Sequence, residues 1–387
     1  MGGPARLWVL LAVAAATDAQ GAVAAASDRF VPADPGFVVA SVRQARPDEK
    51  LLPLIEAWRA DRSSTSTGVA LAAAFMERAR SLREPSYFGR AEAVLEPLAS
   101  KPGAGSARRL YAQVLQYRHE FAAAESQLDT VLREESRDDD ARLLRASVRL
   151  VRGDFDGARA DCAQLAARGG AVAVPGFACF AEALAGSGHL ERGLNLLNIV
   201  PADQRNAETF ARAYLLATRA ELRERSHDAA GAIADYRAAL SLAPHDDSIR
   251  AALADTQSAQ GKSEEARAVL AVDKPSVALL VRSAALAKGS ARADLVARTG
   301  AWLALEAARG DALHFREEAM LALIEGNPAR ALAAARRNFE VQKELPDVRV
   351  LALAARAARD ASALSALRQW LLETGYRDSV TAGIVGL

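Results

Sequence analysis

The sequence predicts an all-α solenoid made of stacked helix-turn-helix repeats, and three observations support this prediction. Apolar residues make up 51% of the chain and are mainly alanine and leucine, which favour helices, whereas aromatic residues make up only 5%. Small residues recur with a period of about 34 residues. Apolar side chains follow each of them at spacings of three and four, which places them on one helical face.

The charge of the chain argues against nucleic acid as a partner. Its 49 basic side chains almost balance 48 acidic ones, and the formal net charge is +1. Binding to a phosphate backbone or an anionic lipid surface depends on an excess of positive charge, which this composition does not supply. We therefore expect no nucleic-acid partner.

The first 26 residues have the features of a secretory signal peptide. Arg6 supplies a positive charge, residues 7–16 form a short apolar core, and residues 22–24 or 24–26 fit an A-x-A cleavage site. The apolar core is too short to span a membrane. The sequence thus predicts a periplasmic or secreted protein with no membrane span after cleavage; an uncleaved anchor and a misassigned start codon are the alternatives.

Residues 27–68 are expected to form an N-terminal arm, a short helix and a polar joint. The stretch 27–47 has no periodicity and contains three prolines, which favours an extended arm. The apolar spacing between Lys50 and Ala60 predicts the short helix. The Ser- and Thr-rich run 61–68 predicts a joint before the first repeat.

The repeats are expected to occupy residues 69–375. The small residue that opens the second helix of each hairpin recurs at intervals of 33, 34, 35, 39, 34, 65 and 32 residues. The interval of 65 covers two units, so it contains one degenerate repeat, residues 275–311. We call these small residues the anchors. They are Ala91, Ala124, Ala158, Gly193, Ala232, Ala266, Ala331 and Ala363.

A second small residue lies twelve positions before each of the first seven anchors, in the preceding helix. Small side chains at both places let the two helices of a hairpin approach closely. These second positions are Ala79, Ala112, Ala146, Ala181, Ala220, Ala254 and Ala319.

This frame resembles the tetratricopeptide repeat family, whose unit is a helix-turn-helix of similar length. Residues 153–158 and 261–266 look like the family's turn between helices, and Pro244 matches its closing proline. The resemblance implies a right-handed solenoid of about seven to eight repeats, in which the first helices line a concave surface. The family's tryptophan near the repeat start is missing, and its asparagine clamp for acidic C-terminal tails is not matched, because Gln113 and Leu144 occupy those positions.

The degenerate repeat and the C-terminal end have predicted structures of their own. Within residues 275–311, the pattern indicates one helix near 276–288 and another near 291–309, separated by Gly289. Residues 376–387 follow the last repeat and are expected to form a C-terminal tail.

The sequence carries no motif for catalysis or for a cofactor. No two of its five histidines are spaced as a helical metal site requires, and the phosphate-binding, nucleophile-elbow and H-E-x-x-H motifs are absent. Asp138 to Asp140 precede a predicted helix, so we interpret them as caps rather than a calcium site. His119, His189 and His227 fall at the same turn of their repeats and are expected to be solvated. The chain is therefore predicted to be no enzyme and to bind no cofactor or metal.

The resemblance also implies where a partner protein or peptide would bind. The first helices should direct a set of polar and apolar side chains toward the concave groove, basic in the first two repeats and acidic in the middle. The predicted groove residues are Met76, Arg80, Arg83, Arg109, Gln113, Gln116, Tyr117, Glu182, Glu221, Glu224 and Asp255.

Cys162 and Cys179 are the only cysteines and fall on neighbouring predicted helices. If these helices pack antiparallel, the two residues are offset by about one turn, roughly 5 Å. A disulfide is then geometrically allowed and would suit an oxidising compartment, whereas two buried free thiols are the alternative.

Together these features favour a non-catalytic scaffold or adaptor in the bacterial cell envelope that binds a peptide or protein in its groove. The alternative is a structural accessory subunit of an envelope secretion, polysaccharide-export or cell-wall complex. An enzyme fused to the repeats would need a second domain, and only residues 27–68 and 377–387 remain for one.

Overall fold

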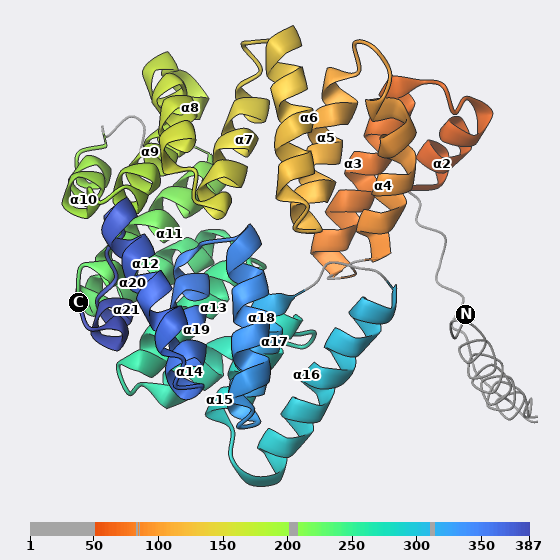
Figure 1. Cartoon of the computed structure of the whole chain (residues 1–387). Coiled ribbons are helices and arrows are strands. Elements are labelled where there is room, and N and C mark those ends of the chain that lie inside the picture. The colour runs from red at the N-terminus through yellow and green to blue at the C-terminus, as the bar shows by residue number, and fades with distance from the viewer. Residues whose placement is uncertain (1–50, 83, 85, 201–207, 310–313) are drawn as a thin grey trace, which may run out of the picture. The chain divides into compact units, whose positions relative to one another are not determined.

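A computed structural model describes residues 51–82, 84, 86–200, 208–309 and 314–387. Within these ranges every regular element is helical, α2 to α21 and one 3-10 turn, and there is no strand (Figure 1). The helices follow one another as hairpins, which confirms the predicted all-α solenoid of helix pairs. The predicted signal peptide, 1–26, and extended arm, 27–47, lie outside the described residues.

Nine consecutive helix pairs make up this part of the chain. The first helices of the pairs are α3 (Thr65–Leu82), α5 (Gly105–Tyr117), α7 (Asp139–Arg152), α9 (Ala173–Gly186), α11 (Thr209–Arg225), α13 (Asp247–Ala259), α15 (Val277–Leu286), α17 (Phe315–Ile324) and α19 (Leu345–Ala357). The second helices are α4 (Ser86–Ala99), α6 (Phe121–Glu134), α8 (Phe155–Arg168), α10 (Leu190–Asn198), α12 (Ala229–Leu242), α14 (Ser263–Leu270), α16 (Gly289–Arg309), α18 (Pro328–Val341) and α20 (Ala361–Thr374). Helix α2 (Leu51–Ala60) precedes the pairs, α21 (Ser379–Val385) follows them, and the 3-10 turn Gly170–Val172 leads into α9.

The anchors lie where the helices of each pair come closest. Six of the seven alanine anchors have no exposed surface, and Ala363 is 6% exposed. At the one glycine anchor, a Cβ on Gly193 would lie 2.5 Å from the carbonyl oxygen of Ala181. This approach is too close for a methyl group, so glycine replaces alanine in this pair.

Aspartates begin several of the helices. The Asp138 carboxylate accepts a hydrogen bond of 2.9 Å from the Ala141 N–H, and the Asp228 carboxylate accepts one of the same length from Gly231 N–H. Such bonds satisfy N–H groups that have no partner within the helix. The interpretation of Asp138 as a helix cap is confirmed.

The structure differs from the prediction at both ends of the array. Helix α3 begins at Thr65, inside the predicted joint, because the Ser64 hydroxyl accepts a hydrogen bond from Thr67 N–H and starts the helix there. The predicted tail contains α21, whose first turn is capped by Asp378 through a 3.1 Å bond from Thr381 N–H. In the degenerate stretch, α15 and α16 form as expected, separated by Gly289 at a φ of 58°.

The C-terminal helices share a core with helices from the middle of the chain. One apolar cluster joins Leu150 and Phe155 of α7 and α8 to Val348 and Leu367 of α19 and α20. Figure 1 shows the C-terminal helices in blue beside the green and yellow-green helices of the middle pairs. The first helices α7 and α9 are therefore in contact with the C-terminal helices of the same chain and do not face an open groove there.

Candidate partner-binding surface

A row of polar side chains crosses the first helices of the three N-terminal pairs. Helix α5 packs beside both α3 and α7. The Arg80 guanidinium donates to the Gln113 side-chain oxygen at 3.5 Å, and the Gln116 amide donates to the Ser147 hydroxyl at 3.4 Å. We name Arg80, Gln113, Gln116 and Ser147 the N-terminal polar row. Arg80 is exposed and the two glutamines are half-buried, so their remaining donors and acceptors face solvent.

The other predicted groove residues of these repeats take different positions. Met76 is 1% exposed and belongs to the apolar core around α2 to α5, so its prediction as a groove residue is wrong. Helix α2 supplies apolar side chains to that core, including Trp58, and the thioether of Met76 packs there instead of facing solvent. Tyr117 is half-buried and stacks on Phe88 with ring centroids 3.8 Å apart. Arg83 lies outside the described residues.

Arg109 has a structural partner. Its guanidinium donates to the Asp138 carboxylate at 2.5 Å, and Asp138 is the cap of α7. Arg109 therefore connects one first helix to the start of the next, and only part of its hydrogen-bonding capacity remains for a ligand.

The predicted acidic residues of the middle repeats face the C-terminal helices. We name Glu182 of α9 with Glu221 and Glu224 of α11 the acidic patch. Glu224 forms an ion pair with Arg349 of α19, and Glu221 lies 3.6 Å from Arg225. The Tyr214 hydroxyl donates to the Glu182 carboxylate at 3.1 Å. The expectation that these three carboxylates line an open groove is corrected, because the chain's own C-terminal helices pack on this surface.

The acidic patch is also unfavourable for negative charge. Burial, with the neighbouring Glu221 and Glu344 carboxylates, raises the pKa of Glu182 to about 8. Burial raises the pKa of Glu221 to about 7, although the positive charge of Arg225 opposes this shift. Near neutral pH a large fraction of both carboxyl groups is therefore protonated, whereas an exposed glutamate would be ionised.

Arg225 connects residues 376 and 377, which precede α21, to α11 and α9. Its side chain is 1% exposed and donates hydrogen bonds of 2.9 Å to the carbonyl oxygens of Arg377 and Ala185. The guanidinium also lies 3.9 Å from the centroid of the Tyr376 ring, a cation–π contact. The fourth predicted acidic residue, Asp255, binds Arg282 at 2.8 Å and so connects α13 to α15.

His119 differs from the prediction for a solvated turn. It adopts a φ of 62°, and its ring contacts that of His314 edge to face, with centroids 5.6 Å apart. Burial lowers the pKa of His119 to about 4. The corresponding turn residues His189 and His227 are exposed, as expected.

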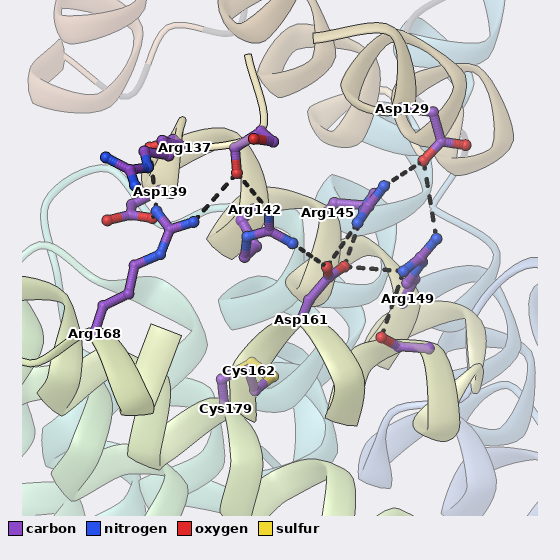
Figure 2. A network of polar contacts seen from close by, with 12 residues as sticks. Asp129, Arg137, Asp139, Arg142, Arg145, Arg149, Asp161, Cys162, Arg168 and Cys179 are labelled. Carbon is purple, nitrogen blue, oxygen red and sulfur yellow. Dashed lines mark hydrogen bonds and ion pairs between the residues drawn. A yellow bond between two sulfur atoms is a disulfide. The ribbon is translucent and has the colours of Figure 1, made fainter. Parts of the chain in front are cut away.

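Two arginine arrangements recur along the described chain, and the constant spacing of their residues is a signal present in the sequence. Arg145 and Arg149 bind Asp161, and Arg219 and Arg223 bind Asp235, with the same separations of 16 and 12 residues. Arg142 adds a third partner for Asp161, as Figure 2 shows. The second arrangement joins an arginine on a first helix to an aspartate cap 29 residues later. It occurs as Arg109 with Asp138 and as Arg349 with Asp378.

Cys162 of α8 and Cys179 of α9 form a disulfide, with Cα atoms 5.6 Å apart (Figure 2). Both residues have no exposed surface. The bond joins the second helix of one pair to the first helix of the next, within the core that the C-terminal helices share. It lies below the arginine network of Asp161 in Figure 2.

Neither a metal centre nor a membrane span is found in the part of the chain that the structure describes. No group of three or more His, Cys, Asp or Glu side chains there is placed to hold an ion. No helix in the same ranges has both the length and the apolarity to cross a bilayer.

Comparison with known proteins identifies the repeat type. Residues 225–276 match the family model described as tetratricopeptide repeat. No curated protein sequence matches the chain.

Several solved structures resemble parts of it. A thermophilic tetratricopeptide repeat protein of Thermus thermophilus has 22% identity and a TM-score of 0.38, over 51% of this chain and 97% of that one. A tetratricopeptide repeat protein of Parabacteroides merdae has 12% identity and a TM-score of 0.39, over 73% and 98%. The Naa15/Naa10 complex bound to HypK-THB has 14% identity and a TM-score of 0.29, over 84% and 56%. These TM-scores are all below 0.5, so the superpositions support no conclusion about this chain.

The matched segment covers the end of α11, α12, α13 and α14, and the anchor frame of those helices repeats on both sides of it. The resemblance drawn from the anchors is therefore confirmed for residues 225–276, which match the tetratricopeptide repeat family model, and the anchors extend the same degenerate frame to the neighbouring helices.

Proposed function

We propose that this protein is an exported, non-catalytic adaptor of the bacterial cell envelope, which binds a peptide or protein segment along the N-terminal polar row. The tetratricopeptide repeat fold suggests a protein interaction scaffold. The proposed binding site rests on the N-terminal polar row. Arg80, Gln113 and Gln116 have hydrogen-bonding capacity beyond the bonds they form, and they lie on neighbouring first helices. An extended peptide could use them in sequence, together with the half-buried ring of Tyr117, which follows Gln116 in α5.

Two features support an envelope location. Residues 1–26 have the composition of a secretory signal. The disulfide between Cys162 and Cys179 suits an oxidising compartment, since thiols in the cytosol are kept reduced. A role without catalysis is supported because tetratricopeptide repeat proteins generally serve as scaffolds.

Affinity capture with matched variants tests the proposal. The full chain is immobilised and exposed to a periplasmic extract, and the captured proteins are quantified by mass spectrometry. The double substitution Arg80→Glu and Gln113→Glu should reduce the specific captured set by about tenfold, because it reverses charge where the partner binds. Arg133→Glu, an exposed change on the second helix α6, is the control and should leave capture unchanged.

The outcomes separate the proposal from its alternative. Equal capture by the double variant and the control would exclude the N-terminal polar row as the contact. If the isolated chain is unstable and becomes folded only within a larger complex, the accessory-subunit alternative is favoured. Thermal melting of all variants serves as the folding check, since exposed substitutions usually change stability by only about 0.5 kcal/mol.

A further inference from the structure

The C-terminal segment, residues 345–387, lies on the acidic patch. It contains α19, α20 and α21 and reaches the patch through Arg349, which pairs with Glu224. Its backbone also approaches the middle repeats closely. A Cβ on Gly375 would lie 3.0 Å from the Gly188 Cα, and the Lys343 N–H just before the segment donates to the Val151 carbonyl oxygen at 2.7 Å.

This contact gathers more negative than positive charge. The acidic patch supplies three carboxylates, and Glu344 adds a fourth that interacts with both Glu182 and Glu221. The opposing cations are Arg225 and Arg349 at the patch and Arg316, which pairs with Glu344 at 2.6 Å. Asp378 lies against Arg349 as well and takes up part of its charge. The protons that Glu182 and Glu221 retain near neutral pH relieve part of the repulsion among these carboxyl groups, so ionisation of the two groups weakens the contact with the segment.

The negative charge of the acidic patch also determines which partner side chains it would attract. A side chain such as arginine or lysine would be attracted to the patch, as Arg349 is. Beside the patch, Tyr376 of the segment lies near Phe155 of α8, with ring centroids 6.2 Å apart. Departure of the segment would therefore uncover an apolar surface next to an acidic one.

We propose that the acidic patch is a second binding surface, which the C-terminal segment occupies through Arg349, and that a partner helix with basic side chains beside an apolar stripe displaces this segment. This inference rests on the proposed scaffold function but assigns a different surface from the N-terminal polar row. The C-terminal segment then acts as an internal competitor, and Arg349 takes the place of a basic side chain of the partner.

Hydrogen exchange of the full chain tests whether the segment can leave. Amides of α19 to α21 and of α11 should exchange together, and about tenfold or more faster than the slowest amides of α3 to α6. That result would show an opening that leaves the rest of the chain folded. If the segment exchanges only with the slowest amides of the chain, it opens only on global unfolding, and the proposal is overturned.

A cross-link provides the matched control for opening. Glu191 and Arg377 form a 3.2 Å ion pair across the contact and are both more than 60% exposed. The double variant Glu191→Cys and Arg377→Cys can be joined by a short bismaleimide. The native cysteines are buried and bonded, so the reagent should react only with the introduced ones. Joining should slow exchange in α11 and α19 to α21, while each single variant treated with the same reagent should not.

A synthetic peptide tests whether the uncovered patch binds a basic helix. The probe copies residues 343–359 of this chain with a fluorescent label, and a second probe carries Arg349→Glu. The first probe should bind the open chain about tenfold more tightly than the cross-linked chain, and the second should bind neither measurably. Equal binding to the open and cross-linked chains, or no binding of the first probe at all, would overturn the proposal. Neither readout uses the natural partner, so a failed capture experiment leaves this test independent.

Discussion

Arg349 of α19 and Glu224 of α11 form an ion pair although 125 residues separate them in the sequence. The same guanidinium donates to Asp378 at 2.7 Å, and Asp378 caps α21. Arg349 of α19 thus connects α11, in a middle repeat, to the cap of α21, the last helix of the described chain. The charges around this pair determine how the stability of the fold responds to pH.

Stability should fall as the pH rises from about 4.5 to 8. The pKa values of Glu182 and Glu221 lie at about 8 and about 7 in the folded chain, above the ordinary value of 4.5. Within this window the folded chain binds more protons than the unfolded chain, so the free energy of unfolding decreases with rising pH. Glu182→Gln should reduce this dependence, as measured by urea unfolding across the window. Exposed Glu77→Gln is the control, and an unchanged slope in Glu182→Gln would contradict the assignment.

Asp161→Ala should destabilise the chain strongly. The Asp161 side chain is 2% exposed and binds Arg142, Arg145 and Arg149. Removal of the carboxylate leaves the guanidinium groups close together without their shared partner, which costs about 3–5 kcal/mol. The control Asp156→Ala lies on the same helix with a side chain 79% exposed and should cost less than about 1 kcal/mol. Similar urea midpoints for the two variants would refute the structural role of the network.

Two glycines should respond to alanine with opposite signs. A Cβ at Gly193 would meet the Ala181 carbonyl oxygen at 2.5 Å, so Gly193→Ala should cost about 1–3 kcal/mol through overpacking. At Gly300 of α16 the nearest atom would be Leu321 Cδ2 at 3.9 Å, so Gly300→Ala should gain about 0.4–1 kcal/mol. Thermal melting measures both. A stabilised Gly193→Ala would show that α9 and α10 are further apart than described.

The disulfide should make the chain sensitive to reducing agents. Unfolded, unreduced protein should contain no titratable thiol. Because the bond closes a loop with a sequence separation of 17, its reduction should lower the free energy of unfolding by about 3 kcal/mol. The variant Cys162→Ala and Cys179→Ala should show no response to the reductant. Two thiols per unfolded chain would instead favour buried free cysteines.

Export predicts a shortened N-terminus on the mature protein. The apolar core ends near Ala16, so cleavage is expected after Ala19, Ala24 or Ala26. Mass spectrometry of the protein from a periplasmic fraction identifies the first residue. Abundant soluble protein that begins at Met1 would argue against an envelope location.

The helix pairs and their caps could be predicted from the sequence because they depend on contacts between residues that are close in the sequence. The anchor Ala232 and its partner Ala220 lie on the two helices of one hairpin, and both are fully buried as their spacing predicts. The cap at Asp138 depends only on residues of the next turn. Such contacts need no knowledge of distant parts of the chain.

The binding surface was less predictable because distant contacts change it. No period along the sequence links Arg349 to Glu224, so the acidic patch was expected to face solvent. Met76 was placed on the groove by repeat position, yet the added helix α2 extends the core to which it belongs. The arginine-to-cap separation of 29 residues was readable in the sequence, and it would have assigned Arg109 a structural partner.

The packing of the C-terminal segment on the middle repeats also restricts how such a chain can change length. In an open array each repeat interacts mainly with its neighbours, so duplication of a terminal unit adds one more similar interface. Here a unit inserted between α13 and α19 would separate Arg349 from Glu224 and Arg225 from Tyr376. These contacts between distant positions therefore constrain the number of repeats. The chain should tolerate substitutions within a repeat better than the gain or loss of a whole repeat.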